Sequence, residues 1–283
     1  MIVFLNGKFV PEHDANVSIF DRSYLYGDGL FETMLVSRGV PFRWGLHMQR
    51  LQRGAAFLRI TLPFNEVQLR QYATRLVEEN QVPNALLRLT VSRGVGIRGY
   101  SARGANAPTL SMSLHPLQQD GRTLTNWKLF TSSFRLPANE PLAQLKHCNK
   151  LPQVLARAEA EQAGADEALL TNTDGKIVEA AAGNLFWIQA GAVCTPPLAG
   201  GILAGVTRIV LLELCQKLRL EFREAATDHK GLLRADGVFL SLSSHGIVQA
   251  ISLDGRSLPT HPLTSKLHDA YANLVELESA EPG

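Results

Sequence analysis

The feature that most limits the fold is a polar, turn-rich segment near the middle of the chain, His115–Thr125. It contains a proline, two glutamines and an Asp-Gly pair, a composition that favours turns over helices or strands. A chain of 283 residues is long enough for one large domain or two modest ones, and the linker favours two. We therefore predict an N-terminal α/β domain over residues 1–115, a linker over 116–125, and a C-terminal domain over 126–283.

The first half mixes strand and helix patterns, which predicts an α+β fold. Two short apolar runs around Asn6-Gly7 are typical of a hairpin over residues 2–10. Strands are expected where β-branched and apolar residues cluster or alternate, and helices where apolar residues recur at helical spacing. The expected strands are 31–37, 85–92 and 109–114, and the expected helices are 44–58 and 62–79.

The second half is richer in strand patterns. A helix is expected over 151–163, with Asn149 as its N-cap and Pro152 in its first turn. Two more amphipathic helices are expected over 205–218 and 263–277. The expected strands are 127–131, 165–171, 176–179, 184–188, 192–195, 237–241 and 247–251.

Composition excludes several classes of function. The net charge is +2 and the arginines are scattered, so a nucleic-acid partner is not expected. The N-terminus lacks the pattern of a signal peptide, and no window is apolar enough to span a bilayer, so no membrane partner is expected. Three widely spaced cysteines favour free thiols in a reducing, cytoplasmic setting over a disulfide framework.

Lys146 is the candidate nucleophile. It follows a segment broken by Pro137 and Pro141 and precedes the helix expected at residue 151. The positive end of that helix and the neighbouring Lys150 both disfavour an ammonium at this position. A neutral amine is what Schiff-base chemistry requires. From spacing alone, a solvated lysine near a helix start is the favoured interpretation.

The motif Gly94-Val-Gly-Ile-Arg-Gly99 matches the dinucleotide-binding fingerprint and follows an expected strand. That fingerprint requires a helix directly after it, but residues 100–108 contain Gly and Pro without apolar helical spacing. A nicotinamide site is therefore not expected. Arg98 and Arg103 suit an anionic ligand instead, since guanidinium pairs with carboxylate through two parallel hydrogen bonds. A solvated surface loop is the alternative.

Other candidate residues are ordinary when each is taken alone. Arg50 would be an exposed helix arginine, Glu179 a surface carboxylate, and Gly205-Val-Thr207 a glycine-rich turn with an N-cap. Free backbone N–H groups at such a helix start can also bind phosphate. The eight histidines lack metal-ligand spacing, and no Gly-x-Ser-x-Gly motif is present, so neither a metal site nor a serine nucleophile is expected.

Four separated blocks change these assessments. Together, and in this order, they resemble the fold-type IV pyridoxal-phosphate enzymes, and the resemblance runs from about Phe4 to Ile251. The family includes branched-chain and D-amino acid aminotransferases and aminodeoxychorismate lyase. It implies a two-domain fold with a small N-terminal α/β sandwich and a larger C-terminal pseudo-barrel, pyridoxal 5′-phosphate as cofactor, a small amino substrate with carboxylates, and a homodimer. The blocks are 27–33, 144–151, 178–186 and 200–208.

The resemblance also implies roles for individual residues. Lys146 would bind the cofactor aldehyde and then act as the base, and Thr33 would help deliver a proton. Glu179 would keep the pyridine nitrogen protonated, so that the ring withdraws electrons. The other expected cofactor-binding residues are Arg50, Leu203, Val206, Thr207 and Ser243. The expected substrate-binding residues are Arg98, Tyr26, Phe31 and Ser244.

Within the family, the wording of three segments is closest to aminodeoxychorismate lyase. They are Arg98-Gly-Tyr-Ser101, the run Lys146–Leu155, and Thr33 after Phe31-Glu32. One departure is Leu242, where such lyases often carry an Asn that meets a substrate carboxylate. The alternatives are an aminotransferase acting on branched-chain or D-amino acids, which shares nearly all of these residues, and a non-enzymatic binding module.

Overall fold

The computed structural model describes residues 1–117 and 123–280 and divides the chain into two compact units. Unit 1 contains Met1–Gln118, Leu145–Asn149 and Val275–Gly283, and unit 2 contains Gln119–Gln144 and Lys150–Leu274. The expected linker, 116–125, lies partly outside the described residues, and its ends belong to flanking strands. The structure differs from the domain prediction at Leu145–Asn149 and from Val275 onward, which both belong to unit 1. The first of these segments pairs with a strand of that unit.

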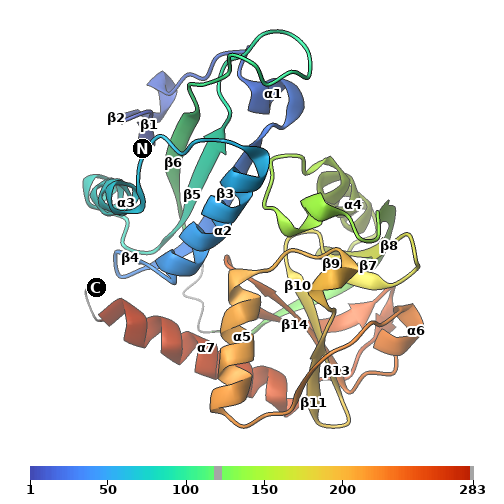
Figure 1. Cartoon of the computed structure of the whole chain (residues 1–283). Coiled ribbons are helices and arrows are strands. Elements are labelled where there is room, and N and C mark those ends of the chain that lie inside the picture. Colours follow the sequence, from blue (N-terminus) through green and yellow to red (C-terminus); the bar gives the residue numbers. More distant parts are fainter. Residues whose placement is uncertain (118–122, 281–283) are drawn as a thin grey trace. The chain divides into compact units, whose positions relative to one another are not determined.

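Unit 1 is built on a six-stranded sheet with the order β2-β1-β6-β5-β3-β4 (Figure 1). Helices α2 and α3 share one apolar core with the sheet, α2 packing on β3 and α3 on β1 and β6. The α/β sandwich implied by the resemblance is thus present. The elements are β1 (Ile2–Leu5), β2 (Lys8–Pro11), η1 (Glu12–Asp14), α1 (Arg22–Tyr26), β3 (Gly29–Ser37), β4 (Val40–Pro41), α2 (Trp44–Leu58), α3 (Glu66–Asn80), β5 (Ala85–Ser92) and β6 (Thr109–Pro116).

Alternation along β3 explains how this strand carries both core and site residues. Leu30, Met34 and Val36 are buried in the unit 1 core, on the face covered by α2. Successive side chains of a strand point to opposite faces, so Glu32 lies on this core face as well, and Phe31 and Thr33 lie on the other. A carboxylate on the core face needs charged partners, and α2 supplies them.

Unit 2 contains a closed barrel of six strands, in the order β10-β13-β14-β7-β8-β9. Strand β9 pairs with both β8 and β10, which closes the ring and confirms the pseudo-barrel. Strands β11, β12 and β15 extend the sheet beyond the ring. The strands are β7 (Thr125–Leu136), β8 (Glu167–Asn172), β9 (Ile177–Ala180), β10 (Asn184–Gln189), β11 (Ala192–Thr195), β12 (Phe222–Glu224), β13 (Gly237–Leu242), β14 (Gly246–Leu253) and β15 (Arg256–Ser257).

Two helices, α4 and α5, pack against strands of the barrel. Helix α4 packs on β7 and β8 through Ala156 and Ala160, whose small side chains allow close approach. Helix α5 contacts β13, and it is the element that carries the expected phosphate site. The helices that follow β7 are η2 (Pro141–Gln144), α4 (Leu151–Gln162), η3 (Leu198–Gly200), α5 (Val206–Lys217), α6 (His229–Leu232) and α7 (Pro262–Ala280), whose residues from Val275 onward belong to unit 1.

Helix α3 differs from prediction at its start, and α4, which begins at Leu151 as predicted, differs in its N-cap. Helix α3 begins at Glu66 and not at residue 62, because Asn65 and Gln68 form a reciprocal capping box there. Asn149 was wrong as the N-cap of α4: the N-cap is Lys150, and the Asn149 amide donates to the Gly27 carbonyl instead. The five-residue helix α1 was not predicted, because it is too short for a periodic pattern.

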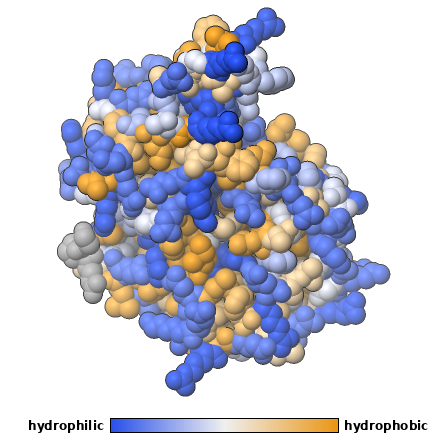
Figure 2. Space-filling view, viewed as in Figure 1, coloured by the Kyte–Doolittle hydropathy of each residue, from blue (hydrophilic) through white to orange (hydrophobic). Residues whose placement is uncertain are grey.

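Hydrophilic residues are spread over the face of the molecule seen in Figure 2, with smaller hydrophobic areas between them. Among the described residues, no helix combines the length and apolarity needed to cross a bilayer.

Candidate active site

Lys146 is held by backbone pairing with β3. The Phe31 N–H donates to the Lys146 carbonyl (2.9 Å), and the Cys148 N–H donates to the Gly29 carbonyl (2.9 Å). The segment therefore forms an antiparallel bridge with β3 between His147 and Leu30, and its Leu145 side chain is buried in the unit 1 core. This pairing fixes the backbone of Lys146, which the sequence did not indicate.

Gly27 makes this approach possible. It ends α1 in the left-handed conformation (φ +67°), which residues with a side chain rarely adopt. A Cβ at this position would lie 2.1 Å from the Asn149 Oδ1 atom. A glycine at residue 27 therefore lets the Leu145–Asn149 segment lie directly against the chain that enters β3.

The Lys146 amine and the Arg88 guanidinium both lie close to one aromatic ring. Its Nζ lies 4.6 Å from the centre of the Phe31 ring, and the Arg88 Cζ lies 3.4 Å from the same centre. Burial lowers the pKa of the Arg88 guanidinium. Thr33 is directly opposite Arg88 in the β3–β5 pairing and shares the Phe31 face of the strand. A lysine, an aromatic ring, an arginine and a hydroxyl thus gather at one end of β3.

On the other face of β3, Glu32 binds two residues of α2. Its carboxylate accepts from Arg50 Nε (2.8 Å) and Nη2 (2.6 Å), and its Oε2 lies 2.7 Å from His47 Nδ1. All three side chains are at most 6% exposed. Because an ionised carboxylate only accepts, the His47 proton must sit on Nδ1.

The pKa values of Glu32 and His47 are both shifted by their surroundings. Burial alone would raise the pKa of Glu32, but Arg50 and His47 hold it at about 2. Burial lowers the pKa of His47, and the nearby cations Arg50 and Lys146 act in the same direction. At neutral pH the group therefore holds an anionic Glu32, a neutral His47 and a cationic Arg50. We name these three residues, with Phe31, Arg88 and Lys146, the lysine cluster.

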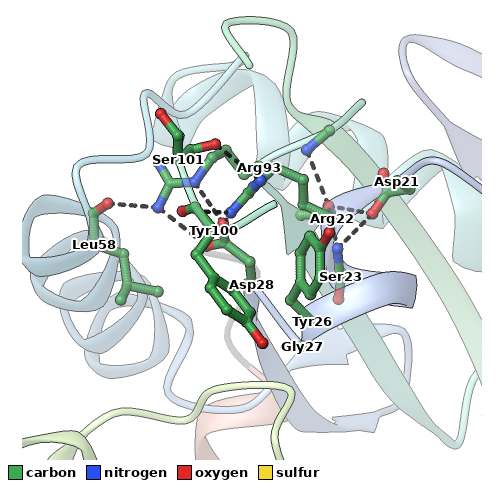
Figure 3. A network of polar contacts seen from close by, with 12 residues as sticks. Asp21, Arg22, Ser23, Tyr26, Gly27, Asp28, Leu58, Arg93, Tyr100 and Ser101 are labelled. Carbon is green, nitrogen blue, oxygen red and sulfur yellow. Dashed lines mark hydrogen bonds and ion pairs between the residues drawn. The ribbon is translucent and has the colours of Figure 1, made fainter. Parts of the chain in front are cut away.

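The expected substrate residue Tyr26 contacts the loop that carries the other, Arg98. Residues 94–108 contain no helix, which agrees with the rejection of a dinucleotide site. The Gly99 N–H donates to the Tyr26 hydroxyl (3.0 Å), and the Tyr26 and Tyr100 rings pack edge to face (Figure 3). Arg98 itself is exposed. Arg98 directly precedes Gly99, whose backbone is held by the hydrogen bond to Tyr26.

In unit 2, Glu179 is tied to the loop before α5. Its Oε2 accepts from the Leu203 N–H (3.0 Å), and the Asn184 amide donates to the Leu203 carbonyl (2.9 Å). Asn184 also lies opposite Glu179 in the β9–β10 pairing. One side chain from each strand thus fixes Leu203 through its backbone, and Glu179 is held where its strand ends.

Helix α5 begins directly beyond this loop. Its N-cap is Gly205, and no side chain caps it. A Cβ on Gly205 would meet the Asn184 Oδ1 atom at 2.0 Å, so the loop and the strand pack in close contact there. Thr207 is buried in the first turn, next to Val206. Uncapped N–H groups and a hydroxyl at a helix start are the donors that a phosphate dianion requires. We name Glu179, Asn184, Leu203, Gly205, Val206 and Thr207 the glutamate cluster.

Ser243 and Ser244 follow β13, and both are half-buried. The Ser244 Oγ lies 2.9 Å from His245 Nδ1. Leu242 is buried, and its side chain belongs to the apolar core of the barrel. Leu242 is therefore surrounded by apolar side chains, which agrees with the absence of the Asn that related lyases often carry at this position.

Comparison with known proteins identifies the family. The model of class IV aminotransferases matches residues 29–253. Three relatives are similar over most of their length. They are a Methanocaldococcus jannaschii protein named as a branched-chain-amino-acid aminotransferase (34% identical, 97% of this chain and 96% of the relative), a D-alanine aminotransferase of Bacillus licheniformis (30%, 99% and 99%), and an aminodeoxychorismate lyase of Bacillus subtilis (30%, 86% and 83%).

This chain belongs to the class IV aminotransferase family. Solved structures agree with the assignment. The branched-chain aminotransferase from Thermoproteus uzoniensis with norvaline superposes with a TM-score of 0.91 (27% identity, 97% of this chain, 94% of that one). The 4-amino-4-deoxychorismate lyase from Pseudomonas aeruginosa gives 0.84 (33%, 96% and 98%). A further similar branched-chain aminotransferase was solved with pyridoxamine 5′-phosphate. The fold-type IV prediction and the pyridoxal-phosphate prediction are both confirmed for this class IV enzyme.

The structure brings several expected class IV site residues into defined surroundings. Lys146 and Phe31 touch in unit 1, and Glu179 and Leu203 touch in unit 2. The roles expected from the resemblance stay predictions, including phosphate binding by Arg50, two of whose donors point at Glu32.

Sequence reasoning missed Glu32, His47, Arg88 and Asn184. One signal was available: an acidic residue on the apolar face of β3 requires a cation, and His47 and Arg50 are three residues apart on one helix face.

Proposed function

We propose that this class IV enzyme is a lyase that converts 4-amino-4-deoxychorismate to 4-aminobenzoate and pyruvate. The observation that carries the proposal is the place of Thr33. Its side chain shares a face of β3 with Phe31, whose ring contacts the Lys146 Nζ at 4.6 Å. Elimination of enolpyruvate needs a proton donor, because the departing carbon must receive a proton, and the Thr33 hydroxyl would be that donor.

The base in this scheme is Lys146. When bound, pyridoxal phosphate supplies an electron-withdrawing ring joined to the substrate nitrogen. The Lys146 Nζ then takes the proton from the ring carbon that carries this nitrogen. The C–O bond to enolpyruvate breaks and the substrate ring becomes aromatic. The Thr33 hydroxyl gives its proton to the leaving carbon and regains one from the Lys146 ammonium, so both residues return to their starting state. Atoms balance, since 4-aminobenzoate and pyruvate together contain all atoms of the substrate.

Binding roles divide between charged and neutral groups. Arg98 would hold a substrate carboxylate through its guanidinium, and Tyr26, Phe31 and Ser244 would line the substrate. Arg50, Thr207 and Ser243 would hold the cofactor phosphate with side-chain donors, and the N-terminal turn of α5 would add the Val206 N–H and its neighbours. Glu179 would keep a proton on the pyridine nitrogen, and Leu203 would fix the orientation of that carboxylate.

An aminotransferase acting on branched-chain or D-amino acids is the second candidate. It is favoured by Leu242, which lies in the barrel core and offers no polar group to a second carboxylate. The 34% identical relative named for branched-chain amino acids supports it too. An aminotransferase would use Lys146 in the same first proton transfer and return the proton elsewhere, so Thr33 would have no role in it.

The deciding experiment compares both reactions on one preparation saturated with pyridoxal phosphate. Pyruvate and 4-aminobenzoate are measured from aminodeoxychorismate, and keto acids are measured from valine, leucine or D-alanine with 2-oxoglutarate. We expect equimolar pyruvate and 4-aminobenzoate at the faster rate. Robust transamination without lyase turnover would refute the proposal.

Thr33 provides the matched variants. Thr33→Val removes the hydroxyl at nearly constant volume, and we expect lyase turnover to fall about 10²-fold, a usual size for loss of a proton donor. Thr33→Ser keeps the hydroxyl and should keep most of the rate. Equal lyase rates in the valine variant and the parent would remove the main support. We also propose a cytoplasmic homodimer, which light scattering of the purified protein tests for its oligomeric part.

A further inference from the structure

Arg22 lies in α1, is 4% exposed, and donates hydrogen bonds from all three nitrogens of its guanidinium. Its Nη1 donates to the carbonyls of Gly99 (2.9 Å) and Ser101 (3.0 Å), and its Nη2 donates to that of Tyr100 (3.2 Å). Its Nε donates to Asp28 (2.9 Å). Three consecutive peptide carbonyls thus turn inward on one buried cation, as Figure 3 shows.

This arrangement determines the shape of the loop. Three successive carbonyls can converge on one point only if the backbone curls around it, and Gly99 makes the curl with φ +101°. The Gly99 N–H is also satisfied, by the Tyr26 hydroxyl. The Arg22 guanidinium lies 5.0 Å from the centre of the Tyr26 ring, and that ring packs on Tyr100. Residues 99–101 therefore have a fixed conformation without belonging to a helix or strand.

The base of this anchor is Asp28, which binds a second arginine. Arg93 donates to Asp28 from Nε (2.7 Å) and Nη2 (3.0 Å), and its Nη2 also reaches the Leu58 carbonyl at the end of α2 (2.8 Å). Burial would raise the pKa of Asp28, but the hydrogen bonds from Arg93 and Arg22 hold it below its usual value. An ionised Asp28 thus links the loop to α1 and to α2.

The start of α1 is fixed independently. Asp21 is its N-cap and accepts from the Ser23 N–H (2.8 Å), from the Thr109 hydroxyl (2.8 Å) and from the Ser92 hydroxyl. Ser92 and Thr109 belong to the neighbouring strands β5 and β6. The element that carries Arg22 is therefore attached to the sheet, and Arg22 works from a rigid base.

We propose that Arg22 is a positioning residue for substrate recognition: it shapes the Gly99–Ser101 backbone and so aims the adjacent Arg98 at an anionic group of the substrate. The inference rests on the proposed role of Arg98 in binding a carboxylate. Arg22 itself is buried against the loop carbonyls and does not touch the substrate. Its loss should raise KM for the carboxylate substrate far more than it lowers kcat, and it should leave affinity for pyridoxal phosphate unchanged.

The first test measures the loop directly. Trypsin cleaves after arginine, and Arg98 and Arg103 both lie on this loop, so limited digestion reports how firmly the loop is held. In Arg22→Ala we expect cleavage after these residues to accelerate about tenfold or more, since a charged hydrogen-bond anchor is removed. Arg22→Lys keeps the positive charge but loses the planar guanidinium with its several donors, so its cleavage rate should lie between those of the parent and the alanine variant. Arg53→Ala, an exposed α2 arginine, is the control and should change nothing.

The second test is a kinetic cycle on whichever substrate the enzyme turns over. Arg98→Ala, Arg22→Ala and the double variant are compared for KM, kcat and pyridoxal-phosphate affinity by absorbance titration. If Arg22 acts through Arg98, each single variant raises KM about tenfold, and the double variant is no worse than Arg98→Ala. Recovery of KM in Arg22→Lys, even in part, supports the same conclusion and guards against a folding defect in the alanine variant.

The outcomes separate the two proposals. If Arg98→Ala leaves KM unchanged, the assigned role of Arg98 fails, whatever Arg22 does. If Arg98→Ala raises KM but Arg22→Ala does not, Arg98 keeps its role and the positioning inference is overturned. If Arg22→Ala raises KM by the same factor in the Arg98→Ala variant as in the parent, the positioning inference is also overturned, because Arg22 would then act on KM independently of Arg98.

Discussion

The lysine cluster of unit 1 and the glutamate cluster of unit 2 are held by opposite means. In the lysine cluster, buried charged side chains hold one another: Glu32 binds Arg50 and His47 at 2.6–2.8 Å. In the glutamate cluster, a single carboxylate binds the backbone N–H of Leu203, and a neutral amide binds the carbonyl of the same residue. The first cluster should therefore respond most to changes of charge, and the second to changes of shape.

The contrast follows from the elements that carry the clusters. Strand β3 and helix α2 present their side chains to a dry core, where an unpaired ion is very costly and must be matched. The loop before α5 instead presents its own backbone. Backbone N–H donors do not titrate, so a site built on them does not depend on pH. It depends instead on how closely the backbone segments approach one another.

Replacing Lys146 should have the largest effect. Lys146→Ala removes the only amine expected to bond to the cofactor and the proposed base, so turnover should fall on the order of 10⁴-fold. The covalent bond is checked by borohydride reduction of the loaded protein, followed by peptide mapping. Lys150→Ala, on the N-cap of α4, is the matched control and should still give a labelled Lys146 peptide. A label found on another lysine would contradict the assignment.

Glu32→Gln should strongly destabilise unit 1. Removing the charge leaves Arg50 buried with an incomplete partner, a change that costs about 3–5 kcal/mol in comparable buried pairs. Urea unfolding of the cofactor-free protein measures this cost. The control is Glu79→Gln, which breaks the exposed Arg75–Glu79 pair and should cost less than about 1 kcal/mol. Equal losses in both variants would mean that burial of the first pair has no energetic consequence.

The Glu32–Arg50 pair also predicts that the free energy of unfolding decreases as the solution becomes acidic. The folded pKa of Glu32 is about 2, below its ordinary value of 4.5, so its contribution is complete above pH 4.5 and is lost as the pH falls toward 2. The lowered pKa of His47 acts in the same direction, because an unfolded histidine gains a proton that the folded one excludes. Stability measured from pH 6 to 3 should therefore fall less steeply in Glu32→Gln than in the parent.

Glu179→Gln should affect chemistry more than stability. The amide oxygen can still accept from the Leu203 N–H, so the loop stays in place while the negative charge is lost. Without that charge the pyridine nitrogen is no longer kept protonated, and we expect turnover to fall about 10²-fold, the usual loss for a preorganised electrostatic partner. Unchanged turnover together with a shifted cofactor spectrum would contradict the role. Glu179→Asp tests whether the position of the carboxylate matters, because it keeps the negative charge and shortens the side chain by one methylene group.

The sequence predicted local structure well and long-range pairing poorly. The β-branched and aromatic residues of β3 and the helical spacing in α2 were enough to locate both elements, because composition and period reflect local conformation and the buried face. Nothing in the run around Lys146 indicates that it pairs with β3, since that depends on Gly27 leaving room for Asn149. Family resemblance supplied Glu179, whereas its partner Asn184 follows only from barrel closure.

The smallest predicted effect tests the shape dependence of the glutamate cluster. The backbone of Gly205 (φ −67°, ψ 137°) suits any residue, so Gly205→Ala adds only a methyl group. That methyl would meet the Asn184 Oδ1 atom at 2.0 Å and displace the amide that holds Leu203. We expect a loss of about 2 kcal/mol in unfolding free energy, typical of overpacking, and weaker pyridoxal-phosphate binding. Gly200→Ala, where the nearest atom is the Val178 Cγ1 at 4.0 Å, is the matched control and should be tolerated. If both glycine variants bind the cofactor as the parent does, close approach at Gly205 is not what holds Glu179, and the contrast between the two clusters loses its basis.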